Sequence, residues 1–271
     1  MFGKLMKYEL RSVMKDFLFI WVGILVLSVV NAFTMSLGNN QELDGFKGFL
    51  FVAVPLLVLF ALYIAAFVVA LLYVLQRFYR GLLGNEGYLM FTLPVSPAQL
   101  IGAKALTALI LEVVSVVVAI LGGVIILLVQ APADFWNVFH AGWQELTRVI
   151  GENPAILLVA AELLLVLLLS ASQANLHLYA GMSLGHLAKK NRIAWSVVAV
   201  VGLNMAVSIL SGWLGNVFGT RIAIDLTGMN YMNGVHATAG MLGLFCLGSL
   251  VLNLMYFFIS RWILMHKLNL E

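Results

Sequence analysis

Six long apolar stretches constrain the fold of this chain more than any other feature of its sequence. They lie near 17–37, 49–75, 105–129, 155–179, 193–214 and 237–260. Each is long enough to cross the hydrocarbon core of a bilayer, which takes roughly 20 helical residues. Because lipid offers no hydrogen-bond partner, the backbone of each stretch must satisfy its own N–H and C=O groups as a helix. The sequence therefore predicts an all-α, polytopic membrane protein with six transmembrane helices.

The composition agrees with this fold class and excludes the main soluble classes. Of the 271 residues, 63% are apolar and 10% are charged, whereas a soluble domain carries about 25% charged residues. So few charged residues cannot cover the surface of a water-soluble domain. This excludes a cytosolic enzyme, a nucleic-acid-binding module and a secreted disulfide scaffold. The single cysteine, Cys246, cannot form an intrachain disulfide.

The basic residues lie mostly on one side of the predicted spans. When the N-terminus is placed in the cytoplasm, all 15 Lys and Arg residues except Lys47, Arg148 and Arg221 fall in cytoplasmic segments. Positively charged loops stay on the cytoplasmic side of a membrane. This asymmetry therefore predicts a multi-pass protein with both termini in the cytoplasm.

Residues 1–16 carry a helical stripe that continues to Phe17, the first residue of the first span. The apolar face consists of Phe2, Leu5, Met6, Leu10, Val13, Met14 and Phe17, and the opposite face of Lys4, Lys7, Arg11, Ser12 and Lys15. An amphipathic helix of this kind can lie in the membrane plane with its basic face toward anionic headgroups. We expect an interface helix that either orients the chain or docks a partner, followed by a transmembrane domain over 17–271.

The cytoplasmic segment 76–103, between the second and third spans, differs from an ordinary solvated linker. It is rich in glycine but also carries many aromatic and aliphatic side chains. A segment with this much apolar surface either packs under the helix bundle or presents a surface to another chain. Its glycines Gly81, Gly84 and Gly87 do not form a phosphate loop, because no Lys-Ser/Thr pair follows and no strand precedes them. The chain therefore cannot hydrolyse ATP by that mechanism.

The end of this segment contains a strong helix-start signal. Ser96 can cap a helix, Pro97 suits the first helical position and Gln99 can complete a capping box. The pattern predicts that the third helix begins in the cytoplasm, well before its membrane portion. A force on 76–103 would then be transmitted along this rigid third helix.

Two glutamates lie within predicted spans, Glu112 near the middle of the third and Glu162 in the outer half of the fourth. An ionisable side chain at this depth costs about 2.5 kcal/mol or more on insertion scales. Each is either a protonated or hydrogen-bonded group that holds two helices together, or part of a polar pathway for a cationic or amphipathic substrate.

The histidines do not indicate a metal site. They fall on different segments and on both sides of the membrane, at His140, His177, His186, His236 and His266. His186 belongs to the short loop between the fourth and fifth spans, where a solvated side chain is expected.

The outer segment 131–154 is predicted to contain an interfacial helix. Aromatic and aliphatic side chains recur at helical spacing from Phe135 to Ile150, and they include two tryptophans. Trp and Phe favour the depth of the membrane interface, which places this helix at the outer leaflet. It would serve as a simple lid or anchor, or as a hydrophobic rim near the exit for a lipid-like or peptide substrate.

One stretch of the sequence resembles a known family signature. It runs from Gly84 to Ser96 and reads GNEGYLMFTLPVS. This resembles the EGYL-x-FTLPVS signature of bacterial ABC-2 type transporter permeases, and Gln99 and Lys104 fit the same pattern. In topology the resemblance covers the whole chain, whereas the long outer segment after the third span departs from it.

The resemblance implies a non-catalytic permease subunit of an ATP-driven exporter in the bacterial inner (plasma) membrane. It also implies a separate cytoplasmic ATPase that binds ATP and Mg, and a second permease copy or a paired permease. The coupling contact to the ATPase would come from Glu86, Gly87, Tyr88, Leu89 and Phe91. Glu86 would meet basic groups of the ATPase, while the aromatic and leucine side chains would fill its cleft.

Two other function classes remain open from the residues alone. A proton-coupled secondary transporter would use Glu112 and Glu162 as carriers, although the sequence has no Gly/Pro-broken helix pair and no obvious inverted repeat. A non-transporting membrane scaffold or immunity-type protein would need the same spans without an ATPase or a polar pathway. An intramembrane enzyme is disfavoured, because no nucleophile–base pair or metal-ligand spacing occurs. Lipid, peptide, drug and ion all remain possible substrates.

Overall fold

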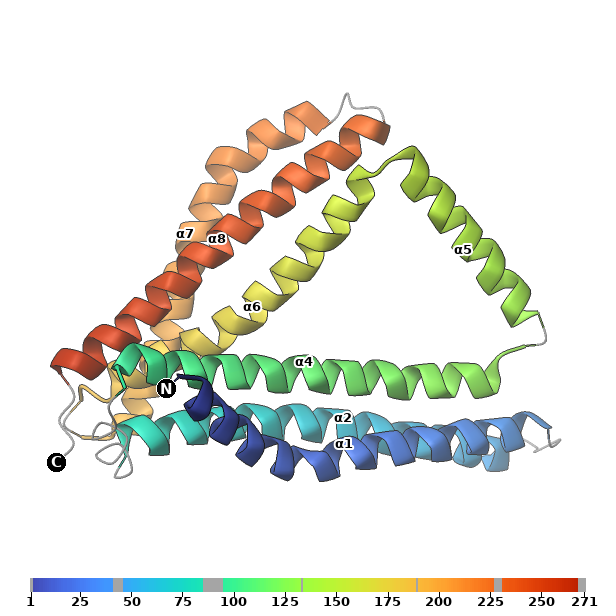
Figure 1. The fold of residues 1–271 in the computed structure, drawn as a ribbon, viewed down its shortest axis with the longest axis horizontal. Helices are drawn as coiled ribbons and strands as arrows, with labels where there is room; N and C mark the ends of the chain where they lie inside the picture. The colour runs from blue at the N-terminus through green and yellow to red at the C-terminus, as the bar shows by residue number, and fades with distance from the viewer. Residues whose placement is uncertain are drawn as a thin grey trace. The chain divides into compact units, whose positions relative to one another are not determined.

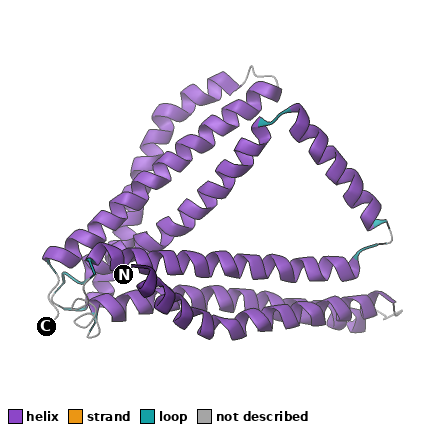
Figure 2. Cartoon of the chain, viewed as in Figure 1, coloured by secondary structure: helices purple, strands orange, loops and turns teal. Residues whose placement is uncertain are grey.

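The computed structural model describes residues 2–40, 46–84, 95–132, 134–188, 190–226 and 231–267. Within these ranges the chain forms α-helices and one short π-helical turn, and none of the described residues belongs to a strand (Figures 1 and 2). The all-α prediction is therefore confirmed.

Six of the helices are long and apolar enough to cross a membrane. They are α1 (Phe2–Asn40), α2 (Phe46–Phe78), α4 (Pro97–Gln130), α6 (Ala155–Gly185), α7 (Arg192–Leu226) and α8 (Tyr231–His266). This confirms the six predicted spans and a multi-pass membrane protein. The helices extend well beyond the predicted apolar stretches, because a helix continues until a breaker or cap ends it rather than at the edge of the hydrocarbon.

The first helix shows this most clearly. α1 has 39 residues and runs without a break through the predicted boundary between 1–16 and 17–271. No proline or glycine occurs near that boundary to interrupt it. Any interface helix over 1–16 is therefore continuous with the first span, and its membrane-surface position stays a prediction.

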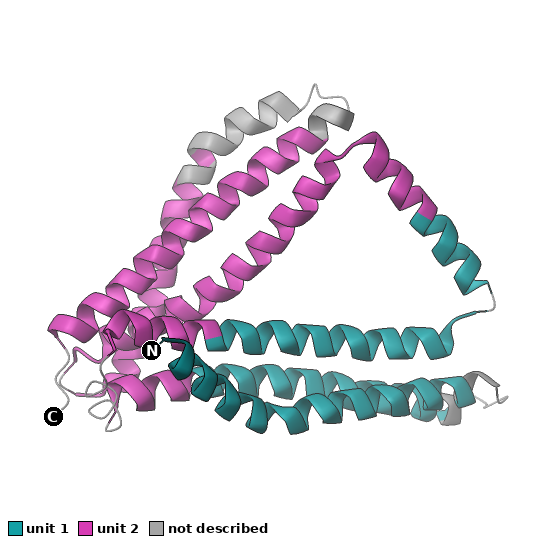
Figure 3. Cartoon of the chain, viewed as in Figure 1, with its two compact units in different colours: residues 1–74, 107–143 teal, residues 75–106, 144–271 magenta. Residues whose placement is uncertain are grey.

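The chain divides into two compact units (Figure 3). The first contains Met1–Val74 and Thr107–Trp143, which include α1, most of α2 and α4, and the start of α5 (Phe135–Glu152). The second contains Leu75–Leu106 and Gln144–Glu271, which include the end of α2, the π-helical turn η1 (Tyr79–Leu83), the start of α4, the rest of α5, and α6 to α8.

In the first unit, side-chain hydrogen bonds join α1 to α4. Trp21 Nε1 donates to Ser115 Oγ over 3.0 Å. Farther along both helices, Gln130 Nε2 donates to the carbonyl of Ala32 over 2.9 Å. Because the residue numbers rise together along both helices, α1 and α4 run parallel, as first and third spans of an up-down-up arrangement must.

The helix α2 joins the same bundle through its polar contacts. Asn31 Nδ2 donates to the carbonyl of Pro55 over 3.0 Å, which fixes α1 against α2. At Gly122 of α4, an added Cβ would lie 2.5 Å from Ser28 Oγ and 2.9 Å from Tyr63 Oη. A larger residue at this position would have to displace the hydroxyl groups of two neighbouring helices, which fill the space beside it. Small residues of this kind let membrane helices approach closely.

In the second unit, α6 packs against both α7 and α8. The closest approach is to α7, where Gly181 faces Val200 and Gly185 faces Ser196. A Cβ at Gly185 would overlap both the backbone nitrogen and Oγ of Ser196. The two glycines are one helical turn apart, so they form the small-xxx-small contact typical of tightly packed membrane helices.

Candidate functional site

The predicted coupling residues all lie outside the described residues: Glu86, Gly87, Tyr88, Leu89 and Phe91. Their roles therefore stay predictions. The flanks of this part of the chain are described up to Gly84 and again from Val95. These flanks determine which helices the segment 76–103 is attached to, and they form the candidate site.

The N-terminal flank is a buried π-helical turn. α2 continues past residue 75, where the apolar span was expected to end, as far as Phe78, and η1 follows over Tyr79–Leu83. Gly81, Leu82 and Leu83 of this turn are buried. Of the two interpretations of 76–103, packing under the bundle is therefore correct for this part. Single π-helical turns are rare in proteins, and many of those that do occur are found at functional sites.

An aromatic stack attaches this turn to α6. The rings of Phe78 and Tyr179 have centroids 3.9 Å apart and are nearly parallel, with an interplanar angle of 8°. Phe78 is 0% exposed and Tyr179 is 1% exposed. Two fully buried aromatic side chains in contact contribute packing energy beyond their buried area. The end of α2 therefore cannot move away from α6 without breaking a large apolar contact.

A buried lysine attaches the same turn to α4. Lys104 Nζ donates to the backbone carbonyl of Arg77 over 3.2 Å, and Lys104 is 5% exposed. A Cβ at Gly81 would lie 2.8 Å from this Nζ atom, so the ammonium group sits directly against η1. The carbonyl groups at the C-terminal end of a helix carry partial negative charge and attract a cation. Lys104 thus stabilises the end of α2 electrostatically.

The C-terminal flank contains the capping box expected from the sequence. The Ser96 N–H donates to Gln99 Oε1 over 3.2 Å, and the Gln99 N–H donates to Ser96 Oγ over 3.3 Å. α4 begins at Pro97 and runs unbroken to Gln130, as the pattern predicted. Residues 85–94 therefore lie between a buried turn on one side and a capped helix start on the other.

The two intramembrane glutamates belong to different units. Glu112 lies on α4 in the first unit, close along the helix to Ser115, the acceptor of the Trp21 bond. Glu162 lies on α6 in the second unit. In both residues the Oε2 atom is inaccessible to solvent.

Glu162 faces α8. Its Oε1 atom lies 3.6 Å from the position that a Cβ would take at Gly243. The backbone carbonyl of Glu162 accepts a hydrogen bond from Cys246 Sγ over 3.8 Å. Its Oε2 atom has no hydrogen-bond partner among the residues that the structure describes. The carboxyl group is therefore held in the α6–α8 contact.

Two hydrogen bonds join α6 and α8 in the same register. Asn253 Nδ2 donates to the carbonyl of Leu169 over 3.0 Å, and this pair, like Cys246 and Glu162, is 84 positions apart. Nearer the C-terminal ends of both helices, the ring of His177 packs edge-to-face against that of Tyr256, with ring centroids 5.0 Å apart. The two helices are therefore parallel, and the two hydrogen bonds lie seven residues apart along each helix.

Replacing Asn253 with leucine should weaken this contact modestly. Interhelical hydrogen bonds in membranes contribute about 0.6 kcal/mol on average and at most about 1.7 kcal/mol, so we expect a loss in that range. Unfolding the purified protein with increasing concentrations of a denaturing detergent would measure this loss in the free energy of unfolding. Asn204→Leu on the exposed side of α7 is the matched control. Equal stabilities of the two variants would contradict a role for the Asn253 bond.

His186 differs from its expected solvated state. It is 6% exposed, because it follows directly on Gly185, where α6 and α7 pack too closely to leave the loop outside. Its Nε2 atom lies 3.4 Å from Arg192 Nη1. The expectation from the sequence was wrong because loop composition carries no information about how tightly two helices pack.

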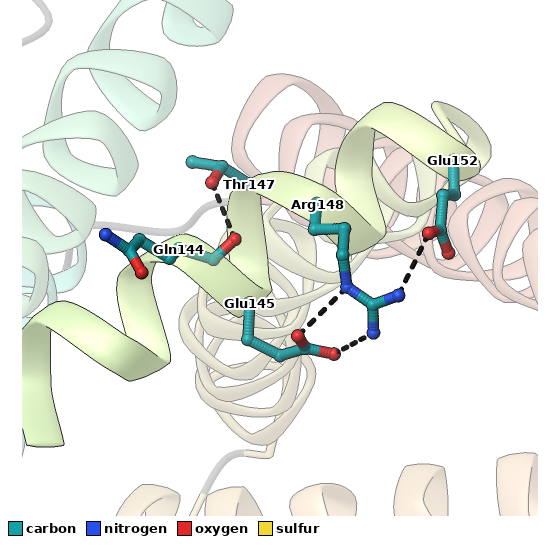
Figure 4. A network of polar contacts seen from close by, with 5 residues as sticks. All are labelled: Gln144, Glu145, Thr147, Arg148 and Glu152. Carbon is teal, nitrogen blue, oxygen red and sulfur yellow. Dashed lines mark hydrogen bonds and ion pairs between the residues drawn. The ribbon is translucent and has the colours of Figure 1, made fainter.

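The outer segment contains the expected helix. α5 spans Phe135–Glu152, and none of its residues is buried. Arg148 donates to Glu145 Oε2 over 3.0 Å and to Glu152 Oε1 over 3.1 Å (Figure 4). The hydrogen bonds and the charge of Arg148 hold the pKa of Glu145 below its ordinary value. The pair therefore contributes its small stabilisation at neutral pH and loses it as acidification protonates Glu145.

Several buried residues, in the site and elsewhere, were not singled out from the sequence. The Phe78–Tyr179 stack joins two distant parts of the chain, and no local pattern indicates it. Glu9 is 6% exposed on α1, although a carboxylate in a basic amphipathic stretch would be expected in solvent. A signal was present in its spacing, because Glu9, Val13 and Phe17 follow one another at four-residue intervals on a single face.

Within the part of the chain that the structure describes, no three His, Cys, Asp or Glu side chains are grouped so that they could hold a metal ion. No protein-family model, curated protein or solved structure matches this chain. Its function therefore has to be inferred from the helices and the contacts described above.

Proposed function

We propose that this chain is the permease subunit of an ATP-driven transporter, an exporter of the bacterial plasma membrane. The observation that carries the proposal is the anchoring of segment 76–103. Its N-terminal flank is attached to α6 through Phe78 and Tyr179 and to α4 through Lys104. Its C-terminal flank enters α4 directly through the capping box.

This anchoring is more than a connection between two spans requires. A simple linker leaves the membrane, turns and re-enters, and it has no need of a buried π-helical turn or a buried lysine. Here a displacement of residues 85–94 would be passed to α2, α4 and α6 through rigid, buried contacts. A permease that is driven by a separate cytoplasmic ATPase needs such a connection between the surface that contacts the ATPase and its own membrane spans.

The proposed partner is a cytoplasmic ATPase that binds ATP and Mg, since this chain carries no phosphate-binding loop. The coupling surface would consist of Glu86, Gly87, Tyr88, Leu89 and Phe91, with both termini of the chain on the same, cytoplasmic side. Six helices rarely enclose a pathway alone, so two permease chains would work with two ATPase chains, either as two copies or as a pair of different permeases.

Affinity purification of the full chain in mild detergent tests the proposal. A stoichiometric partner that hydrolyses ATP should co-purify, and it should be lost when Tyr88→Ala and Phe91→Ala are combined. The matched control is Trp136→Ala with Phe139→Ala. This control removes two aromatic side chains from α5, which follows the opposite end of α4. Retention of the partner by the coupling variant, or its equal loss from the control, would contradict the coupling assignment.

A proton-coupled secondary transporter is the alternative that the buried carboxyl oxygens of Glu112 and Glu162 favour. In that case the chain would purify without an ATPase, and transport would follow the proton gradient. Glu112→Gln and Glu162→Gln would then abolish transport. Full transport by Glu112→Gln at every pH would exclude Glu112 from either mechanism.

A further inference from the structure

The helix α5 has an apolar face and a polar face that are cleanly separated. At about 100° of rotation per residue, Phe139 and Arg148 point in opposite directions. The apolar face carries Phe135, Trp136, Phe139, Trp143, Leu146 and Ile150. Four of these side chains are large and exposed: Trp136 at 58%, Phe139 at 50%, Trp143 at 57% and Leu146 at 46%. Water is an unfavourable environment for such a surface.

The chain holds both ends of α5 close to the membrane. Residues 131–134, which join it to the end of α4, reach no more than about 14 Å. Residues 153–154, which join it to the start of α6, reach no more than about 7 Å. Since α4 leaves the membrane where α6 enters it, both tethers start at the same leaflet. α5 is about 27 Å long, so with both ends held it lies along that surface.

The corner between α5 and α6 is fixed by hydrogen bonds. The Asn153 N–H donates to the carbonyl of Val149 over 3.0 Å, which extends the last turn of α5. Asn153 Oδ1 accepts from the Ala155 N–H over 3.2 Å, and the Asn153 carbonyl accepts from the Ile156 N–H over 3.1 Å. Asn153 itself is buried. The orientation of this end of α5 relative to α6 is therefore set by the fold.

The charges of α5 cannot bind an acidic surface. Its polar face carries Glu145, Arg148 and Glu152, and the single arginine is paired with both glutamates (Figure 4). No lysine occurs anywhere in the helix. Helices that are drawn to anionic headgroups carry Lys and Arg on the polar face. Any attachment of α5 to a surface must therefore come from its apolar face.

We propose that α5 is a membrane-surface anchor whose aromatic face is buried at the headgroup–acyl boundary of the leaflet where α4 ends and α6 begins. The occupant of this face is the lipid interface itself, and the binding needs no acidic lipid. Tryptophan and phenylalanine suit this depth. This inference does not depend on the proposed transport function.

Spin labels on the two faces of α5 test the anchor in the full-length chain. In a Cys246→Ser background, Leu146→Cys places a nitroxide label on the apolar face and Gln144→Cys places one on the polar face two residues away. The protein is reconstituted into vesicles of phosphatidylcholine, alone or mixed with phosphatidylglycerol. Accessibility to oxygen, which concentrates in lipid, is compared with accessibility to a water-soluble nickel chelate.

The label at 146 should be accessible to oxygen and shielded from nickel, and the label at 144 should show the reverse. The result should be the same in both kinds of vesicle. Three outcomes would overturn the proposal. Both labels could be equally accessible to nickel, which would place α5 in water. The label at 146 could be shielded from both reagents, which would indicate a protein partner, or it could enter lipid only with phosphatidylglycerol present.

Discussion

Replacing Gly185 with leucine is expected to prevent stable folding of the second unit. A Cβ at this position would overlap the backbone nitrogen of Ser196, so α6 and α7 would have to separate along their closest contact. Backbone atoms cannot move aside as the end of a flexible side chain can. We therefore expect a loss of about 3 kcal/mol or more, at the upper end of overpacking penalties. His186 should become exposed in any protein that survives purification.

Gly202→Leu on α7 is the matched control, because nothing lies within 4 Å of the position that its Cβ would take. Thermal unfolding and size-exclusion profiles of both variants in detergent would measure the difference. The control should behave like the wild type, or slightly better, since leucine favours a helix more than glycine does. A Gly185→Leu protein as stable as the control would mean that the α6–α7 contact is not as close as described.

Replacing Phe78 with alanine should have an effect of similar size. Phe78 is fully buried against Tyr179, and truncation of buried phenylalanine costs about 3–5 kcal/mol. The loss should concentrate at the base of segment 76–103, because η1 follows Phe78 directly. If the proposed coupling is correct, the variant should still bind its ATPase through residues 85–94 but transport much less per ATP hydrolysed.

The control for this variant is Phe67→Ala on the same helix, where the side chain is 68% exposed. It removes the same atoms without opening a cavity, so its stability should change little. Hydrogen exchange around residues 79–84 would separate the two variants, since only Phe78→Ala should speed exchange there. Unchanged exchange with unchanged stability would mean that the stack does not hold η1 in place.

Sequence reasoning was most successful where the signal is local or is set by the solvent. The six spans follow from the length of the apolar stretches, because the bilayer imposes one length and one secondary structure. The capping box at Ser96 and Gln99 was predicted because its hydrogen bonds connect residues three apart. The helix α5 followed from the spacing of its apolar side chains.

The parts that could not be predicted depend on contacts between distant residues. The extension of α2 into η1 is stabilised by Tyr179 and Lys104, which lie far away in the sequence. His186 is buried because of a glycine contact with α7, whereas the loop that follows it contains the basic residues Lys189, Lys190 and Arg192. Nor does any periodic pattern distinguish the face of α6 that meets α8 in the first half of this helix, because residues 155–169 are apolar on every side apart from Glu162.

The hydrogen bonds between α6 and α8 have a consequence for how substitutions are tolerated. Cys246 and Asn253 both donate from α8 side chains, whereas the acceptors on α6 are the main-chain oxygens of Glu162 and Leu169. Main-chain oxygens are present whatever the amino acid. In a saturation mutagenesis experiment, position 169 should therefore tolerate apolar substitutions better than position 253 does. These two hydrogen bonds therefore depend on the side chains of α8 and on main-chain atoms of α6.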